Sequence, residues 1–115
     1  MYQPQTLASL HIMLALASQE RHGYEIMKQA FADSQGVVKL GPATLYSNIK
    51  KLHELGLIEE ASERPDPSLD DSRRKYYRLT SKGMSALGAE MERMNHLVRL
   101  GEEQKASRLV QPSWA

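Results

Sequence analysis

One helix of this sequence carries a polar face whose residue types and spacing suit hydrogen bonding to DNA bases. The face consists of Thr44, Ser47, Asn48 and Lys51, which repeat at i, i+3, i+4 and i+7. A separate buried stripe with helical spacing consists of Leu45, Ile49 and Leu52. Asn pairs with adenine through two hydrogen bonds, and Ser or Thr contacts several bases in the major groove. The pattern therefore predicts a recognition helix, although any amphipathic surface helix has the same two faces.

Both ends of this helix are marked in the sequence. Pro42 suits the first turn, where its missing N–H costs nothing, and Gly56 suits the position just past the last turn. Cationic and phenolic side chains nearby are expected to contact phosphates, which position a protein on DNA. These candidates are Lys39, Tyr46, Lys50, Arg73, Arg74 and Lys75. For Tyr46 the alternative is packing on the preceding helix, and for residues 73–75 it is pairing with nearby carboxylates.

The elements that must position these residues follow in the order helix, helix, strand, helix, hairpin. Apolar spacing predicts a helix over 7–17 that is buried on most sides, a polar break at 19–21, and a second helix over 23–33. The inward positions expected in the second helix are Ile26, Met27, Ala30 and Phe31. Val37–Leu40 is short and begins with two β-branched residues, which predicts a strand.

After the recognition helix, residues 57–63 and 73–80 have the composition of two strands joined by a polar loop over 64–72. The complete order predicts a winged helix-turn-helix domain over residues 1–80. The expected fold class is therefore mainly α with a small β-hairpin (α+β), followed by a long C-terminal helix.

A last helix is expected from Thr80 or Ser81 to about Leu109, with a tail at 111–115. Its apolar positions are spaced 3, 4, 3 and 4 residues apart, as in a heptad seam: Met84, Leu87, Met91, Met94 and Val98. Because no segment is left to cover this seam, we expect residues 81–110 to form a dimerisation helix against a second copy. Since methionine repacks easily, a pocket for a small lipophilic or aromatic effector is the alternative use of this region.

Composition and motifs narrow the class of protein. The chain has 115 residues, a net charge of +1 and no cysteine, so thiolate metal sites are excluded and charge alone gives no support to nucleic-acid binding. No apolar run approaches the roughly 20 residues of a transmembrane helix, and the first residues lack a basic signal-peptide region. The histidines have no metal-binding spacing, and no nucleophile elbow or P-loop occurs. We therefore expect a cytoplasmic protein, associated with the nucleoid when bound, that is not an enzyme and uses no cofactor or metal.

Four motifs occur in a fixed order along the chain. They are His22-Gly23-Tyr24-Glu25, then Pro42-Ala43-Thr44-Leu45-Tyr46, then Leu52 with Gly56-Leu57-Ile58, then Arg74 to Thr80 with Gly83. In this order and spacing they resemble the PadR family of bacterial transcriptional regulators over about residues 7–100. The single C-terminal helix resembles the small subgroup of that family, whose members dimerise through it. The resemblance implies a winged-helix dimer that represses transcription, often until a small molecule releases it.

Three features depart from the family pattern. Gly41 stands where Ser commonly precedes the proline, and Ser47 stands where Pro commonly follows the tyrosine. The loop over 65–72 is acidic, with Asp66, Asp70 and Asp71, which would repel phosphates. We expect a homodimeric, sequence-specific regulator that binds double-stranded DNA and acts as a repressor. The alternative is a winged-helix module that binds another protein and not DNA, which the near-neutral charge and the acidic loop favour.

Overall fold

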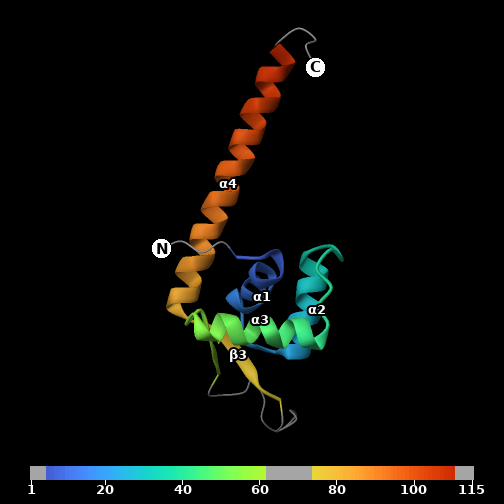
Figure 1. The fold of residues 1–115 in the computed structure, drawn as a ribbon, viewed down its shortest axis with the longest axis vertical. Helices are drawn as coiled ribbons and strands as arrows, with labels where there is room; N and C mark the ends of the chain where they lie inside the picture. The colour runs from blue at the N-terminus through green and yellow to red at the C-terminus, as the bar shows by residue number, and fades with distance from the viewer. Residues whose placement is uncertain (1–4, 62–73, 111–115) are drawn as a thin grey trace.

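The structure is a computed structural model that describes residues 5–61 and 74–110. The elements follow in the order α1 (Leu7–Ala17), β1 (Arg21–His22), α2 (Gly23–Asp33), α3 (Pro42–Glu54), β2 (Ile58–Glu60), β3 (Tyr76–Leu79) and α4 (Ser81–Val110). Figure 1 shows α1 to α3 and the sheet gathered into one body, from which α4 rises. This arrangement is a winged helix-turn-helix with a long C-terminal helix, so the predicted fold class is confirmed.

Local sequence signals set the ends of the helices. Thr6 caps α1 by accepting a hydrogen bond from the Ser9 N–H at 3.1 Å. Gly41 occupies the N-cap of α3 without a side-chain bond, and Pro42 takes the first turn. Beyond the end of α3, Gly56 has a φ of 75°, a conformation that glycine adopts without strain. These ends agree with the predicted ones.

The core lies where α1 packs against α2, α3, the sheet and the first turns of α4. Its fully buried side chains include Ile12, Met13, Ile26, Leu45, Leu52 and Ile58. The apolar stripe predicted for α3 is therefore buried, with Ile49 also only 5% exposed. One expectation is corrected: Phe31 of α2 points outward and is 48% exposed. Most of α1 is buried as predicted, although Leu7 and Leu14 are exposed.

The sheet has three antiparallel strands in the order β1-β3-β2. The predicted strand over Val37–Leu40 is wrong: this segment has no regular structure and instead buries Val38. The third strand is Arg21–His22, where a polar break was expected, because His22 pairs with Tyr76 across the sheet. The hairpin strands are confirmed but shorter than predicted. The acidic loop over 65–72, Arg73 and the tail at 111–115 lie outside the described residues.

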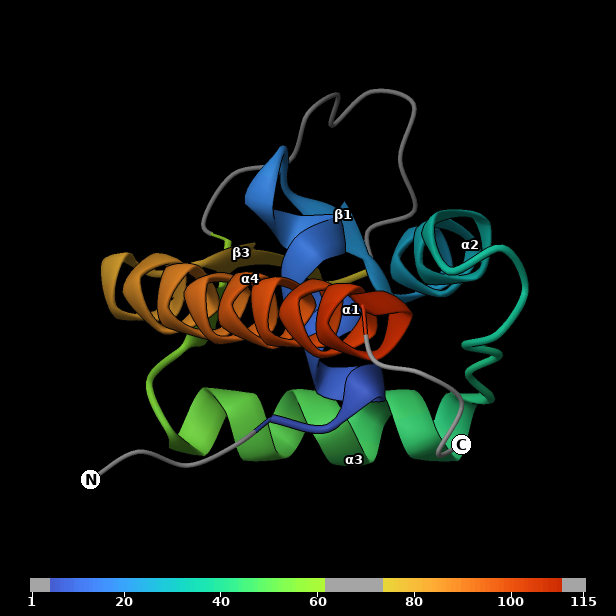
Figure 2. The same cartoon turned by 90° about the horizontal axis from the view of Figure 1, so that it is seen from above.

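The start of α4 is fixed tightly to the domain. Thr80 Oγ1 donates to the Gly56 carbonyl at 2.6 Å and accepts from the Gly83 N–H at 3.0 Å, so Thr80 caps the helix. A Cβ at Gly83 would collide with the Leu57 carbonyl, so only glycine allows this close approach. Seen from above, α4 crosses over α1 (Figure 2), against which it packs. Leu87, predicted on the dimer seam, is only 4% exposed because it belongs to the chain's own core.

Candidate nucleic-acid interface

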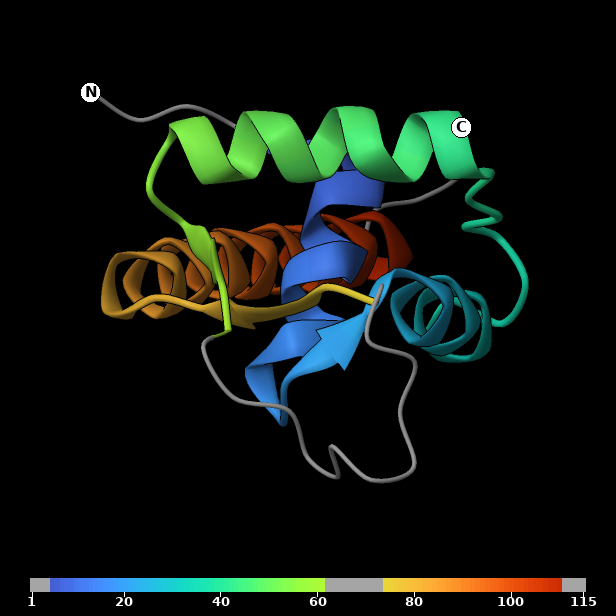
Figure 3. The ribbon, with the colours of Figure 1, turned by 90° about the horizontal axis from the view of Figure 1, so that it is seen from below.

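The outward side of α3 presents the polar face that the sequence predicted. Figure 3 shows α3 along one side of the molecule, seen from below. Leu45, Ile49 and Leu52 face the core, and the opposite side of the helix is exposed. The exposed candidates on α3 are Thr44, Tyr46, Ser47, Lys50 and Lys51. A helix exposed in this way can enter a major groove, which is wide enough for one α-helix.

Asn48 differs from the other members of the polar face because it lies at the border with α1. Its Oδ1 accepts a hydrogen bond from the Ser9 hydroxyl at 2.8 Å, and its Nδ2 donates to the Thr44 carbonyl, also at 2.8 Å. Ser9 is fully buried. Asn48 therefore anchors α3 to α1, and only its remaining amide hydrogen and lone pair are left for a base.

A recess beside α3 brings together several of the predicted phosphate contacts. It has a volume of about 300 Å³ and is open to solvent. Its lining comes from β1, α2, α3, β3 and the residues just before β3: His22, Gly23, Tyr24, Tyr46, Arg74, Lys75 and Tyr77. Tyr46 thus belongs both to the outer face of α3 and to this recess, which joins the two surfaces into one candidate interface.

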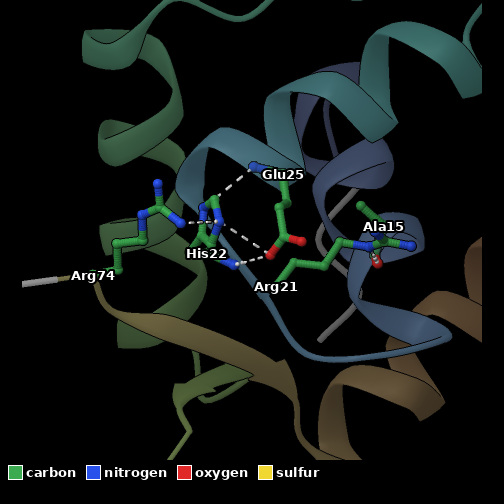
Figure 4. A network of polar contacts seen from close by, with 5 residues as sticks. All are labelled: Ala15, Arg21, His22, Glu25 and Arg74. Carbon is green, nitrogen blue, oxygen red and sulfur yellow. Dashed lines mark hydrogen bonds and ion pairs between the residues drawn. The ribbon is translucent and has the colours of Figure 1, made fainter. Parts of the chain in front are cut away.

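The recess is built around the first turn of α2, shown in Figure 4. His22 Nδ1 accepts from the Glu25 N–H at 3.5 Å, and Glu25 Oε1 accepts from the His22 N–H at 3.2 Å, which together form a capping box. On its other side, His22 Nε2 lies 3.5 Å from Arg74 Nη1. The capping box therefore sets the position of His22 between α2 and Arg74.

Gly23 allows α3 to approach the start of α2. A Cβ at Gly23 would lie 2.5 Å from the Tyr46 hydroxyl and 3.1 Å from a Leu45 methyl group. The phenol of Tyr46 therefore rests over the first residue of α2 while half of its surface remains exposed. Packing on α2, one of the two uses considered for Tyr46, therefore occurs, and phosphate contact through its hydroxyl stays a prediction.

The chemistry of the recess favours an anion. The N-terminus of an α-helix carries a partial positive charge, and here it lies beside a guanidinium and an ammonium group. Burial, followed by the neighbouring Tyr46 and Glu60, raises the pKa of Tyr77 above its ordinary value. The Tyr77 phenol therefore keeps its proton and remains a hydrogen-bond donor. The sequence analysis did not predict His22, Gly23, Tyr24 and Tyr77 as lining residues. The available signal was the His-x-x-Glu spacing of a capping box, which indicates that a helix starts here.

The family to which the chain belongs follows from comparison with known proteins. The model of the family described as "Transcriptional regulator PadR-like family" matches residues 12–89. The chain belongs to the PadR-like family. A Lysinibacillus sphaericus protein, described as uncharacterized, is 33% identical over 76 residues, which are 66% of this chain and 67% of the relative.

Solved structures of PadR-like proteins and other regulators share the fold. A transcriptional regulator from Clostridium thermocellum has a TM-score of 0.68 at 23% identity, covering 84% of this chain and 87% of its own. A PadR family transcription regulator from Clostridium difficile has the same score and identity, covering 85% and 97%. The resemblance to PadR regulators that the motifs indicated is therefore confirmed.

The remaining cations of this PadR-like protein divide into two groups. Arg78 of β3 is neutralised within the fold: its Nε donates to Glu59 at 2.8 Å, which is the main reason that its pKa is raised, and its Nη1 lies 3.7 Å from Glu20. Lys39 and Lys50 are exposed, Lys39 just before α3 and Lys50 on its outer face. In the part of the chain that the structure describes, no helix is both long and apolar enough to cross a membrane.

Proposed function

We propose that this PadR-like protein is a homodimeric, sequence-specific DNA-binding regulator that represses transcription. The observation that carries the proposal is the continuity between the exposed polar face of α3 and the cationic recess at the start of α2, joined by Tyr46. A groove-reading helix needs a nearby phosphate contact to fix its register on the duplex. Membership in a family of transcriptional regulators supports the same conclusion.

Each part of the interface has its own role in this proposal. Thr44, Ser47 and Lys51 contact base edges, and Asn48 adds its remaining amide hydrogen while holding α3 against α1. One DNA phosphate enters the recess and is bound by Arg74, Lys75 and the partial positive charge at the start of α2. Lys39 and Lys50 bind flanking phosphates. Ser47 places a hydroxyl in the centre of the polar face of α3. We therefore expect this protein to recognise an operator sequence that differs from those of its relatives.

Dimerisation is supported by the exposed side chains of α4. The candidate seam residues Met84, Met91, Met94 and Val98 are between 42% and 61% exposed in the single chain. Leu97 and Leu100 of α4 are also exposed, by 64% and 40%. A second copy that covers this surface would place two recognition helices on one duplex, with half-sites about 34–36 Å or a multiple of that apart. The resemblance to PadR repressors supports repression and release by a small effector.

The test compares Arg74, which lies just before β3, with Arg78, which lies within β3. Binding of the full-length protein to its own promoter fragment is measured by fluorescence anisotropy at several salt concentrations. Arg74→Ala should weaken binding about tenfold or more and lower the slope of log affinity against log salt by roughly one for each phosphate that the variant no longer binds. Arg78→Ala removes a charge that Glu59 and Glu20 already neutralise, so it serves as the matched control and should leave the slope unchanged.

Two results would contradict the proposal. Equal effects of Arg74→Ala and Arg78→Ala would mean that the recess does not hold a phosphate. Salt-insensitive binding, or no binding to any genomic fragment, would favour the protein–protein interaction module instead.

A further inference from the structure

A chain of hydrogen bonds links the start of α1 to the polar face of α3. It begins at the N-cap of α1, where Thr6 Oγ1 accepts from the Ser9 N–H at 3.1 Å. The Ser9 hydroxyl lies 2.8 Å from Asn48 Oδ1, and Asn48 Nδ2 lies 2.8 Å from the Thr44 carbonyl. Figure 3 shows the start of α1 against the middle of α3. A side chain of the proposed reading face is therefore tied to the protein interior.

The donors and acceptors in this chain have only one consistent assignment. A carbonyl oxygen can only accept, so the atom of Asn48 that faces the Thr44 carbonyl must be the NH2 group. The amide oxygen of Asn48 then faces Ser9, whose hydroxyl must donate to it. Both ends of the amide are therefore held, and its oxygen and nitrogen cannot exchange places without loss.

The burial of Ser9 makes this orientation of the amide costly to change. Ser9 is 0% exposed, and Leu45 and Ile49, which flank Asn48 on α3, belong to the hydrophobic core. If the amide turned away from α1, the buried Ser9 hydroxyl would lose its acceptor, which costs free energy. If the amide turned over in place, its oxygen would face the Thr44 carbonyl oxygen and be repelled.

The held amide keeps one N–H and one lone pair for a base. Adenine needs this combination in the major groove, because its N7 accepts and its N6 amino group donates. Guanine presents two acceptors, N7 and O6, so a fixed amide oxygen disfavours it, whereas a freely turning amide could offer guanine its NH2 group. Asn48 is half-buried and its neighbours Thr44 and Ser47 are exposed, so the amide lies at the edge of the face proposed to enter the groove.

We propose that Ser9 is a positioning residue for base selection. It holds the Asn48 amide so that each half-site is read as adenine, and not guanine, at the base pair that Asn48 meets. This inference rests on the proposed function, because it assumes that α3 enters the major groove. Since Ser9 is buried, it acts only through Asn48. Its removal should change which base is preferred and leave the phosphate contacts as they are.

The test is the selection of bound sequences from a random duplex library by the full-length protein. The unmodified protein should enrich adenine over guanine at least about fivefold at one position of each half-site. Ser9→Ala should reduce this ratio to about two or less, while other positions and the salt dependence of binding stay unchanged. In a protein that already carries Asn48→Ala, Ser9→Ala should alter no base preference. Ser85→Ala, at an exposed position of α4, is the matched control.

A second measurement needs no DNA. The two side-chain amide protons of Asn48 should shift in the NMR spectrum of Ser9→Ala, because the hydrogen bond to the amide oxygen is lost. If Ser9→Ala does not fold, Ser9→Cys replaces it, since a thiol of similar size is a weaker donor and should reduce the adenine preference part of the way. Unchanged amide signals in a folded variant would overturn the inference.

The selection experiment separates this inference from the proposed function. A uniform loss of affinity in Ser9→Ala, with every base preference intact, would mean that Ser9 is only structural and would overturn the inference. An adenine preference that persists in Asn48→Ala would overturn it as well, while the proposed function stands. If the unmodified protein enriches no sequence at all, the proposed function and this inference fail together.

Discussion

At the scale of single residues, the candidate interface depends on how closely side chains approach the start of α2. His22 places its two ring nitrogens between the backbone of α2 and the guanidinium of Arg74. Gly23 leaves the space in which the Tyr46 hydroxyl rests. These two neighbouring residues therefore shape the recess without supplying its charge. Their role explains why a His-Gly pair opens this helix, where Ser or Asp would be the ordinary cap.

Gly23→Ala tests this close approach through a double-mutant cycle with Tyr46→Phe. The new Cβ would lie 2.5 Å from the Tyr46 hydroxyl, so the phenol must move and Leu45 must adjust. We expect Gly23→Ala to lower the free energy of unfolding by about 1–2 kcal/mol, and by less when Tyr46 is already Phe. Urea unfolding followed by circular dichroism measures all four variants. Additive effects would show that the hydroxyl does not rest over Gly23.

At the scale of elements, the apolar stripe of α3 and the residues Pro42 and Gly56 determine where this helix lies. Its N-cap contributes little. The Gly41 N-cap makes no side-chain hydrogen bond, and a Cβ at Gly41 would meet no atom within 4 Å. Its φ of −85° is one that any residue adopts. The start of the proposed recognition helix therefore has room for a better cap.

Gly41→Ser should stabilise the protein for this reason. The serine hydroxyl would accept a hydrogen bond from an N–H of the first turn of α3, worth a few tenths of a kcal/mol, to about 1 at most. Gly41→Ala, which fills the same space without an acceptor, is the matched control. Thermal unfolding followed by circular dichroism should place Gly41→Ser above the control. A serine variant no more stable than the alanine variant would show that α3 begins elsewhere.

The helices were predicted well because their sequences carry strong local signals. Repeating apolar spacing and end signals such as Pro42 and Gly56 indicated the bounds of α1, α2 and α3 within a residue or two. The misplaced strand has a different cause: β1 is two residues long and exists only because His22 pairs with Tyr76, which is 54 positions away. Helical spacing predicted that Phe31 faces the core, yet its ring lies at the surface, against the turn at Gly36. Neither of these contacts leaves a periodic pattern in the sequence.

The candidate site was predictable to a similar degree. The exposed face of α3 follows from helical spacing alone, and Asn48 departs from it only because Ser9 reaches it from α1. The recess combines residues from four elements and the segment just before β3, so no single stretch of sequence contains it. A pocket of about 360 Å³ between α2 and the segment before α3 was not predicted for the same reason, since each of them supplies one wall.

At the scale of the whole molecule, the shape requires an explanation that the single chain does not supply. The molecule measures 66 × 31 × 23 Å because α4 extends well beyond the other elements (Figure 1). The apolar residues of α4 are exposed along this extension, and Leu7 and Leu14 of α1 are exposed as well. Burying a methionine or leucine side chain contributes about 1.5–3 kcal/mol, so a second copy that covers this surface would gain considerable stability.

Met91→Glu combined with Met94→Glu tests whether α4 forms the dimer. Four buried carboxylates in one interface should raise the dissociation constant of the dimer by at least about a hundredfold. Analytical ultracentrifugation should then find the mass of one 13.0 kDa chain, whereas the unmodified protein is expected to sediment at twice that mass. Ser85→Glu with His96→Glu adds the same charges at exposed positions away from the seam and should remain dimeric. If the methionine variant also remains dimeric, the chains associate through another surface, and the spacing of half-sites proposed for the operator has to be derived from that surface instead.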